Sequence, residues 1–161
     1  MRIGVVSDTH NNLKNCHRIV KLFNDAGVDA VVHTGDITQA RTLGVFASLD
    51  APLYGVFGNN DQERDELIAA ARESGFHFQD PPLEVVWSKR RIVVVHDPRE
   101  LQGALSPEHD LALHGHTHML RMERKAHQLI FNPGECAGHM VGLNAVGVVD
   151  LDSLEPHLLH F

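Results

Sequence analysis

The chain has 161 residues, of which 43% are apolar and 22% are charged, a composition typical of a globular domain with its own hydrophobic core. A formal net charge of −7 disfavours binding to long nucleic acid or to an anionic membrane. The two cysteines, Cys16 and Cys136, lie far apart without a C-x-x-C pattern, so we expect reduced thiols and a cytoplasmic protein. Residues 1–10 have too few apolar positions before Asp8 for a signal peptide, and no apolar run approaches the ~18 residues of a membrane span, so we expect neither export nor insertion.

The first half of the chain repeats a strand, a polar loop and a helix. We expect strands at 2–6, 30–32 and 52–57. Expected helices follow at 13–26, from a Thr38 cap to 49, and from 61 or 62 to about 74. This order predicts parallel strands with right-handed crossovers.

The second half is predicted to be rich in strands, because the helical periodicity ends after Pro81-Pro82. Expected strands are 83–87, 91–95, 111–114, 119–124, 128–131, 144–151 and 156–161, with a short helix near 99–104. No linker is long enough to separate two folding units, so we expect one domain over residues 1–161.

Polar residues follow the ends of the first three expected strands, which is where α/β sheets place their sites. Asp8 and His10 form an i, i+2 pair that would point to one side in extended backbone. Asp36 and Asn59 follow glycines in the two corresponding loops. Asp61 closes the third loop, and we expect it to cap the following helix.

Histidines follow two later strands. His96 ends the Val93–Val95 run, and His116 and His118 repeat the i, i+2 spacing in His114-Gly115-His116-Thr117-His118. Taken alone, each motif is better explained as a turn, a helix cap or a structural histidine than as a ligand. Together they supply two mixed nitrogen and oxygen coordination shells without a thiolate.

The order D-x-H, G-D, G-N-N-D, a histidine after a strand, and G-H-T-H resembles the calcineurin-like metallophosphoesterase superfamily. The short chain is similar to the compact YfcE-type phosphodiesterase branch, and the resemblance extends from Met1 to about Gly134. It implies a four-layer α/β/β/α sandwich of two mixed β-sheets flanked by helices.

The resemblance also implies a metal centre. The first ion would be held by Asp8, His10, Asp36 and His118. Asp36 would bridge to the second ion, whose other ligands would be Asn59, His96 and His116. Two divalent ions, two carboxylates and one bridging hydroxide leave a charge of about +1, which attracts a phosphate. An imidazole-rich shell suits Mn²⁺, Ni²⁺, Fe or Zn²⁺ better than Mg²⁺, and we expect Mn²⁺ first among them.

Three positions depart from the pattern of relatives. Asn60 stands where relatives have His or Cys, and its carboxamide can contact a phosphoryl oxygen but cannot act as a general acid. Asp97 replaces a common glycine after His96. Glu135 replaces a common serine, and either repels phosphate or pairs with a basic neighbour.

Other histidines lie beside these motifs. His33 and His114 could orient ligands or touch substrate, and His139 is a further candidate in the loop after Asn132-Pro133-Gly134.

The function expected from the resemblance is hydrolysis of small phosphodiesters by in-line attack of a metal-bridging hydroxide. The alternatives are a non-catalytic interaction scaffold, as in the retromer subunit of this superfamily, and a phosphomonoesterase or protein phosphatase. The short chain leaves little room for a peptide-binding insertion, and a homo-oligomer is left open.

Overall fold

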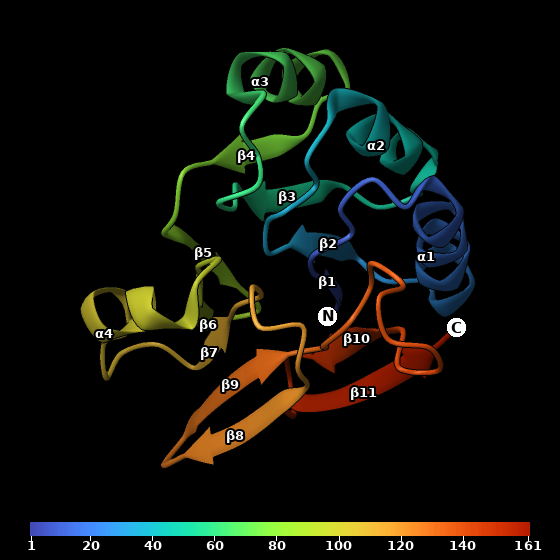
Figure 1. Cartoon of the computed structure of the whole chain (residues 1–161). Coiled ribbons are helices and arrows are strands. Elements are labelled where there is room, and N and C mark those ends of the chain that lie inside the picture. Colours follow the sequence, from blue (N-terminus) through green and yellow to red (C-terminus); the bar gives the residue numbers. More distant parts are fainter.

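The computed structural model describes all residues from Met1 to Phe161 and contains two mixed β-sheets packed face to face (Figure 1). The six-stranded sheet has the order β11-β10-β1-β2-β3-β4. Its strands are β1 (Arg2–Val6), β2 (Ala30–His33), β3 (Leu53–Val56), β4 (His77–Gln79), β10 (Ala145–Asp150) and β11 (Glu155–His160). Strands β1 to β4 are parallel, whereas β10 and β11 run antiparallel to their neighbours.

The five-stranded sheet has the order β5-β6-β7-β9-β8. Its strands are β5 (Leu83–Trp87), β6 (Arg90–Val94), β7 (Leu111–Leu113), β8 (Arg121–Lys125) and β9 (Gln128–Asn132). Strands β6, β7 and β9 are mutually parallel, and β5 and β8 pair antiparallel at the two edges.

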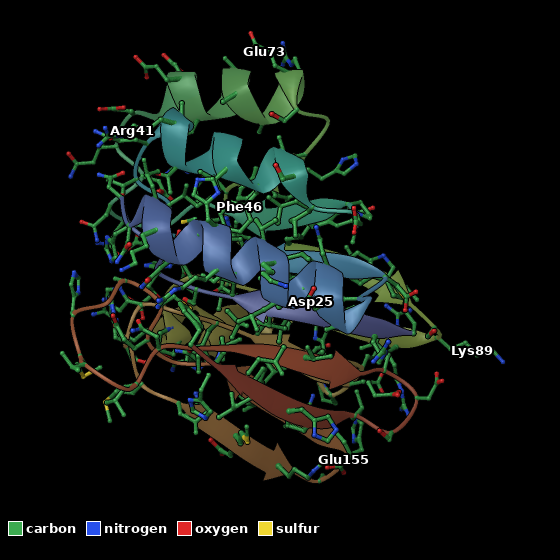
Figure 2. The ribbon with its side chains drawn as sticks, turned by 90° about the vertical axis from the view of Figure 1, so that its right-hand side faces the viewer. Asp25, Arg41, Phe46, Glu73, Lys89 and Glu155 are labelled. Atoms are coloured by element: carbon green, nitrogen blue, oxygen red, sulfur yellow. The ribbon has the colours of Figure 1, made fainter.

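Helices cover the outer faces of both sheets. Three helices, α1 (Leu13–Ala26), α2 (Ala40–Val45) and α3 (Arg64–Glu73), lie side by side over the six-stranded sheet (Figure 2). The outer face of the five-stranded sheet carries only η2 (Pro98–Glu100) and α4 (Leu101–Ala104). The predicted four-layer α/β/β/α sandwich is therefore confirmed, with a thin fourth layer. None of the helices combines the length and apolar character needed to cross a bilayer.

The hydrophobic core has one layer on each side of the six-stranded sheet. A cluster of 15 buried residues fills the space between the sheets, with Val5, Val32, Leu113 and Phe131 among them. A second cluster of 17 buried residues lies under α1, α2 and α3. Because the central strands β1, β2, β7 and β9 are buried on both faces, the two sheets hold the carboxyl ends of these strands at fixed positions relative to each other.

Some predicted boundaries are wrong. Thr38 does not cap α2; the helix begins at Ala40 and gives way to η1 (Phe46–Ser48). The reason is that the Thr38 backbone N–H donates to the Asp61 carboxylate, which holds Thr38 in the preceding loop with φ 81°. Helix α3 begins at Arg64 rather than at 61 or 62. The three-residue edge strand β4 was not predicted, since so short a segment shows no alternation.

Candidate metal centre

The predicted site residues lie in loops that follow parallel strands of both sheets. Asp8, Asp36 and Asn59 follow β1, β2 and β3, while His96 and the Gly115 loop follow β6 and β7. The carboxyl ends of these strands meet at one edge of the sandwich, as contacts between the two groups show. The topology thus brings together residues more than 100 positions apart in the chain.

A first set of donor atoms lies around Asp8. The His10 Nε2 and His118 Nε2 atoms are 3.4 Å apart, and His118 Nε2 lies 3.7 Å from Asp8 Oδ1. Asp36 Oδ2 lies 4.0 Å from His10 Nε2. Asp8 is fully buried and the two imidazoles are partly exposed, so the set opens toward solvent on one side.

A second set of donor atoms shares Asp36 with the first. His96 Nε2 lies 3.5 Å from Asp36 Oδ2 and 2.9 Å from Asn59 Oδ1. His116 Nδ1 lies 3.0 Å from Asn59 Oδ1 and 3.3 Å from His96 Nε2. All seven predicted ligands therefore face one another, in two groups that meet at one carboxylate.

The spacing and chemistry of these atoms fit divalent ions. Ligands about 2.1 Å from an ion, at tetrahedral or octahedral angles, lie about 3.0–3.4 Å from one another. Most of the distances between donor atoms, from 2.9 to 3.7 Å, lie near this range, whereas His10 Nε2 and Asp36 Oδ2 are 4.0 Å apart. The donors combine imidazole nitrogen with carboxylate and amide oxygen. The three residues Asp8, Asp36 and His96 also form a buried group of the kind that binds a cation.

Asp36 is held as an anion at the junction of the two sets. The Asn60 backbone N–H donates to Asp36 Oδ1 at 2.8 Å, and the Asn60 amide Nδ2 donates to Asp36 Oδ2 at 2.7 Å. Burial favours the neutral acid, but the hydrogen bonds and charge of His96, together with Asn60, hold the Asp36 pKa well below its usual range. The same contact with Asp36 outweighs burial and raises the His96 pKa to about 9.

The candidate ligands lie in left-handed turns and not in the extended backbone that we expected for the i, i+2 pairs. The expectation of extended backbone is wrong, because Asp8, His10, Asp36, His116 and His118 all have φ between 45° and 69°. Non-glycine residues in this left-handed region cost on the order of 1 kcal/mol or more each, and such strain accumulates at functional sites. Tertiary hydrogen bonds hold the turns, as in the bond from the Asp8 N–H to the Gly35 carbonyl.

Asp61 does not cap α3, so the prediction of a helix cap is wrong. Its carboxylate is 2% exposed and accepts hydrogen bonds from the backbone N–H groups of Gly58, Asp36 and Thr38, at 2.7, 3.0 and 2.6 Å. It therefore ties the loop after β3 to the loop after β2. Asp61 therefore makes tertiary contacts, which its position just before the helix in the sequence does not predict.

Glu135 pairs with His118, as the second of its two predicted behaviours requires. The Glu135 carboxylate is 1% exposed, and its Oε2 accepts a hydrogen bond from His118 Nδ1 at 2.5 Å. Burial opposes ionisation, but this bond and the His139 backbone N–H lower the Glu135 pKa. His118 therefore presents Nε2 to the first donor set and Nδ1 to a buried carboxylate, the usual arrangement of a metal-binding histidine.

His139 extends the first donor set outward. Its exposed ring stacks on His10 and His118, with ring centroids 5.6 and 5.5 Å away. In the sequence, His139 is only a further candidate, because it lies in the loop after Asn132-Pro133-Gly134 and not beside one of the metal-binding motifs as His33 and His114 do.

His33 and His114 lie behind the site rather than in it. His33 is fully buried, where its Nε2 meets Thr9 Oγ1 at 3.0 Å and its Nδ1 accepts from the Gly35 N–H. His114 is 1% exposed, and burial lowers the pKa of both imidazoles, that of His33 to about 3. Because both side chains are buried, they can orient neighbouring groups but do not reach a substrate.

The glycine of the histidine-rich loop is required by close packing. A Cβ atom at Gly115 would overlap the Ser7 hydroxyl and would lie 2.7 Å from Asp8 Oδ2. Only glycine lets the loop after β7 approach the loop after β1 this closely.

Comparison with known proteins agrees with this geometry. The family model of the calcineurin-like phosphoesterase superfamily domain matches residues 1–154. The chain is 33% identical over 159 residues to phosphodiesterase MJ0936 of Methanocaldococcus jannaschii, covering 96% of both proteins. It is 27% identical to phosphodiesterase YfcE of Escherichia coli K12, covering 96% of this chain and 90% of that protein.

The fold is also shared with a solved relative. The structure described as a novel archaeal phosphodiesterase superposes with a TM-score of 0.92 over 100% of both chains, at 30% identity. The chain belongs to the calcineurin-like phosphoesterase superfamily.

Proposed function

We propose that the protein is a metal-dependent phosphodiesterase that hydrolyses small phosphodiesters with two divalent ions. The observation that carries the proposal is the pair of donor sets joined at Asp36, with His10 and His118 on one side and His96 and His116 on the other. Mn²⁺ is the ion of first choice for this shell, followed by Ni²⁺, Fe and Zn²⁺. The names of the relatives support the reaction class.

The chemistry divides between the ions and the chain. When bound, the two ions would lower the pKa of water and neutralise phosphoryl oxygens, so that water attacks phosphorus in line with the departing ester oxygen. Asp8 and Asp36 would supply the negative charge that holds the ions, and Asp61 and Glu135 would fix the loops and the His118 ring. Asn60 holds Asp36 with its amide and offers no proton to the leaving oxygen.

The alternative functions fit the site less well. An interaction scaffold has no need of two complete, partly strained donor sets. A protein phosphatase requires a surface for peptide, which this short chain does not add to the fold. For the location, we retain the cytoplasm as a proposal, since Cys16 and Cys136 are free thiols.

Reconstitution with metal tests the proposed function. Protein loaded with Mn²⁺ should hold about two ions per chain, measured by elemental analysis, and should hydrolyse bis(p-nitrophenyl) phosphate faster than p-nitrophenyl phosphate. Chelator treatment should abolish both activities, and Mn²⁺ should restore them. One ion at saturation, or no turnover of either ester with any of the four metals, would refute the proposal.

Replacing Asp36 and Asp61 separates the shared ligand from the loop support. Asp36→Asn should lose most of both ions, because it removes the carboxylate common to the two donor sets. Asp61→Asn leaves backbone N–H groups unpaired, so it should cost about 1–3 kcal/mol of unfolding free energy and part of the metal. Asp65→Asn, in the exposed first turn of α3, is the control. The unfolding free energy in urea and the metal content are measured for both variants. Equal values in Asp61→Asn and Asp65→Asn would contradict the role assigned to Asp61.

Replacing Glu135 tests the support of His118. Glu135→Gln keeps the side-chain shape and removes the charge, so metal affinity should fall about 10–100-fold, as for other carboxylates that orient a metal-binding histidine. A competing chelator dye measures the dissociation constant. Glu123→Gln, at an exposed residue paired with Arg121, should leave it unchanged. Equal affinities in wild type and Glu135→Gln would reject this role.

Substitution at Asn60 tests how the leaving group departs. Without a general acid at this position, rates on substituted phenyl diesters should depend steeply on the leaving-group pKa. Asn60→His supplies an acid whose proton transfer typically contributes ~10²–10⁴-fold, and the gain should be confined to poor leaving groups. Asn60→Gln, which has no titratable proton, should show no such gain. A shallow dependence in wild type would indicate another acid.

A further inference from the structure

A third imidazole lies beside the two histidines of the first donor set. The rings of His10, His118 and His139 form a nearly equilateral triangle, with centroids 5.3, 5.5 and 5.6 Å apart. A ring nitrogen of His139 also lies within 4.8 Å of a ring nitrogen of His118. His139 is exposed, whereas the other two rings are partly buried, so it lies on the solvent side of the set. The first donor set therefore has a neighbouring nitrogen donor that none of the sequence motifs supplies.

The triangle of rings has the size expected for imidazoles that share one ion. A metal-bound imidazole nitrogen lies about 2.1 Å from its ion, so the centroids of two such rings are about 4.5–5.5 Å apart at octahedral or tetrahedral angles. The three observed distances lie at the upper end of this range. Rings that merely stack also have centroids about 4.5–7 Å apart. The way in which the loop of His139 is held distinguishes the two cases.

One buried carboxylate connects His139 to a ligand of the first set. The His139 backbone N–H donates to Glu135 Oε1 at 2.7 Å, and Glu135 Oε2 accepts from His118 Nδ1 at 2.5 Å. Glu135 is 1% exposed and has a partner on each oxygen, so we assign it support of the two histidines rather than the role of a ligand. The contact that orients the His118 ring thus also fixes the backbone of His139 beside it.

Helix α1 holds the same loop through two asparagine side chains. Asn12 Nδ2 donates to the Ala137 carbonyl at 2.8 Å, and Asn15 Nδ2 donates to the Cys136 carbonyl at 2.9 Å. Gly138 has a φ of 84°, and a Cβ atom there would lie 2.9 Å from Asn12 Nδ2, so only glycine lets the chain turn this close to the helix. The segment before His139 is therefore fixed by side chains from another element, as is usual for a loop that positions a ligand.

We propose that His139 is a further ligand of the first ion, which is then held by three imidazoles together with Asp8 and Asp36. The second ion has two imidazoles, one amide and the shared carboxylate. With one more imidazole and one more carboxylate, the first site binds its ion more tightly than the second. This ligand role rests on the proposed two-ion function and deepens it, because it ranks the two sites by affinity.

NMR of the wild-type protein with ¹⁵N-labelled histidines tests the ligand role directly. A ring nitrogen that binds Zn²⁺ takes a chemical shift distinct from those of a protonated and of a free nitrogen, whereas a ring that only stacks does not. One ring nitrogen of His139 should take the metal-bound shift when the first equivalent of Zn²⁺ is added, together with those of His10 and His118. His139 signals that remain those of a free imidazole after two equivalents would overturn the proposal.

Variants at position 139 separate coordination from stacking. His139→Phe keeps an aromatic ring but has no nitrogen, so the affinity for the tighter ion should fall about 10-fold or more, as it does even when a group that only supports a ligand is lost. His139→Asp, which offers a carboxylate oxygen, should recover part of this loss. His17→Ala, at an exposed histidine of α1, is the matched control and should bind as wild type does. A competing chelator dye measures both dissociation constants, and urea unfolding checks that each variant is folded.

The outcomes are distinct from those of the proposed function. If the wild-type protein holds two ions but folded His139→Phe binds both with wild-type affinity, the three rings only stack, and the two-ion centre stands without His139. A third ion per chain that His139→Phe removes would also overturn the ligand role, because His139 would then belong to a separate site with Glu135. If the wild-type protein holds fewer than two ions at saturation, the proposed function itself fails.

Discussion

The arrangement of this molecule depends on burying four carboxylates at one edge of the sandwich. Asp8, Asp36, Asp61 and Glu135 are each no more than 2% exposed. A buried carboxylate without partners costs several kcal/mol, so each must be satisfied locally. Asp61 is satisfied by three backbone N–H groups, and Glu135 by His118 and a backbone N–H. Asp36 accepts from the backbone N–H and the amide of Asn60, Asp8 accepts from the Ser7 hydroxyl and the His116 N–H, and both carboxylates also face imidazoles of the donor sets.

This constraint explains why strained backbone is tolerated in the same loops. Five candidate ligands adopt left-handed conformations that are unfavourable for residues with a Cβ atom. The strands that precede these loops are buried on both faces, and Asp61 joins two of the loops directly. The rigid sheets thus hold the loops in conformations that a free peptide would not keep.

Two of the three departures from the family pattern lie beside histidines of the Gly115 loop. Glu135 contacts His118 Nδ1 at 2.5 Å, and Asp97 lies 3.8 Å from His116 Nε2. Glu135 adds a buried carboxylate beyond His118, whereas the charge of Asp97 is paired with the Arg99 guanidinium.

The sequence by itself determined the type of most strands and helices, because apolar runs and helical periodicity report burial directly. The order of its polar motifs also indicated the seven candidate ligands, through the resemblance to the superfamily. Only the tertiary structure decided which atoms meet: Asp61 bonds to loops instead of α3, and Glu135 finds His118. These contacts depend on packing two sheets together, and no local pattern encodes the distance between residues that are far apart in the chain.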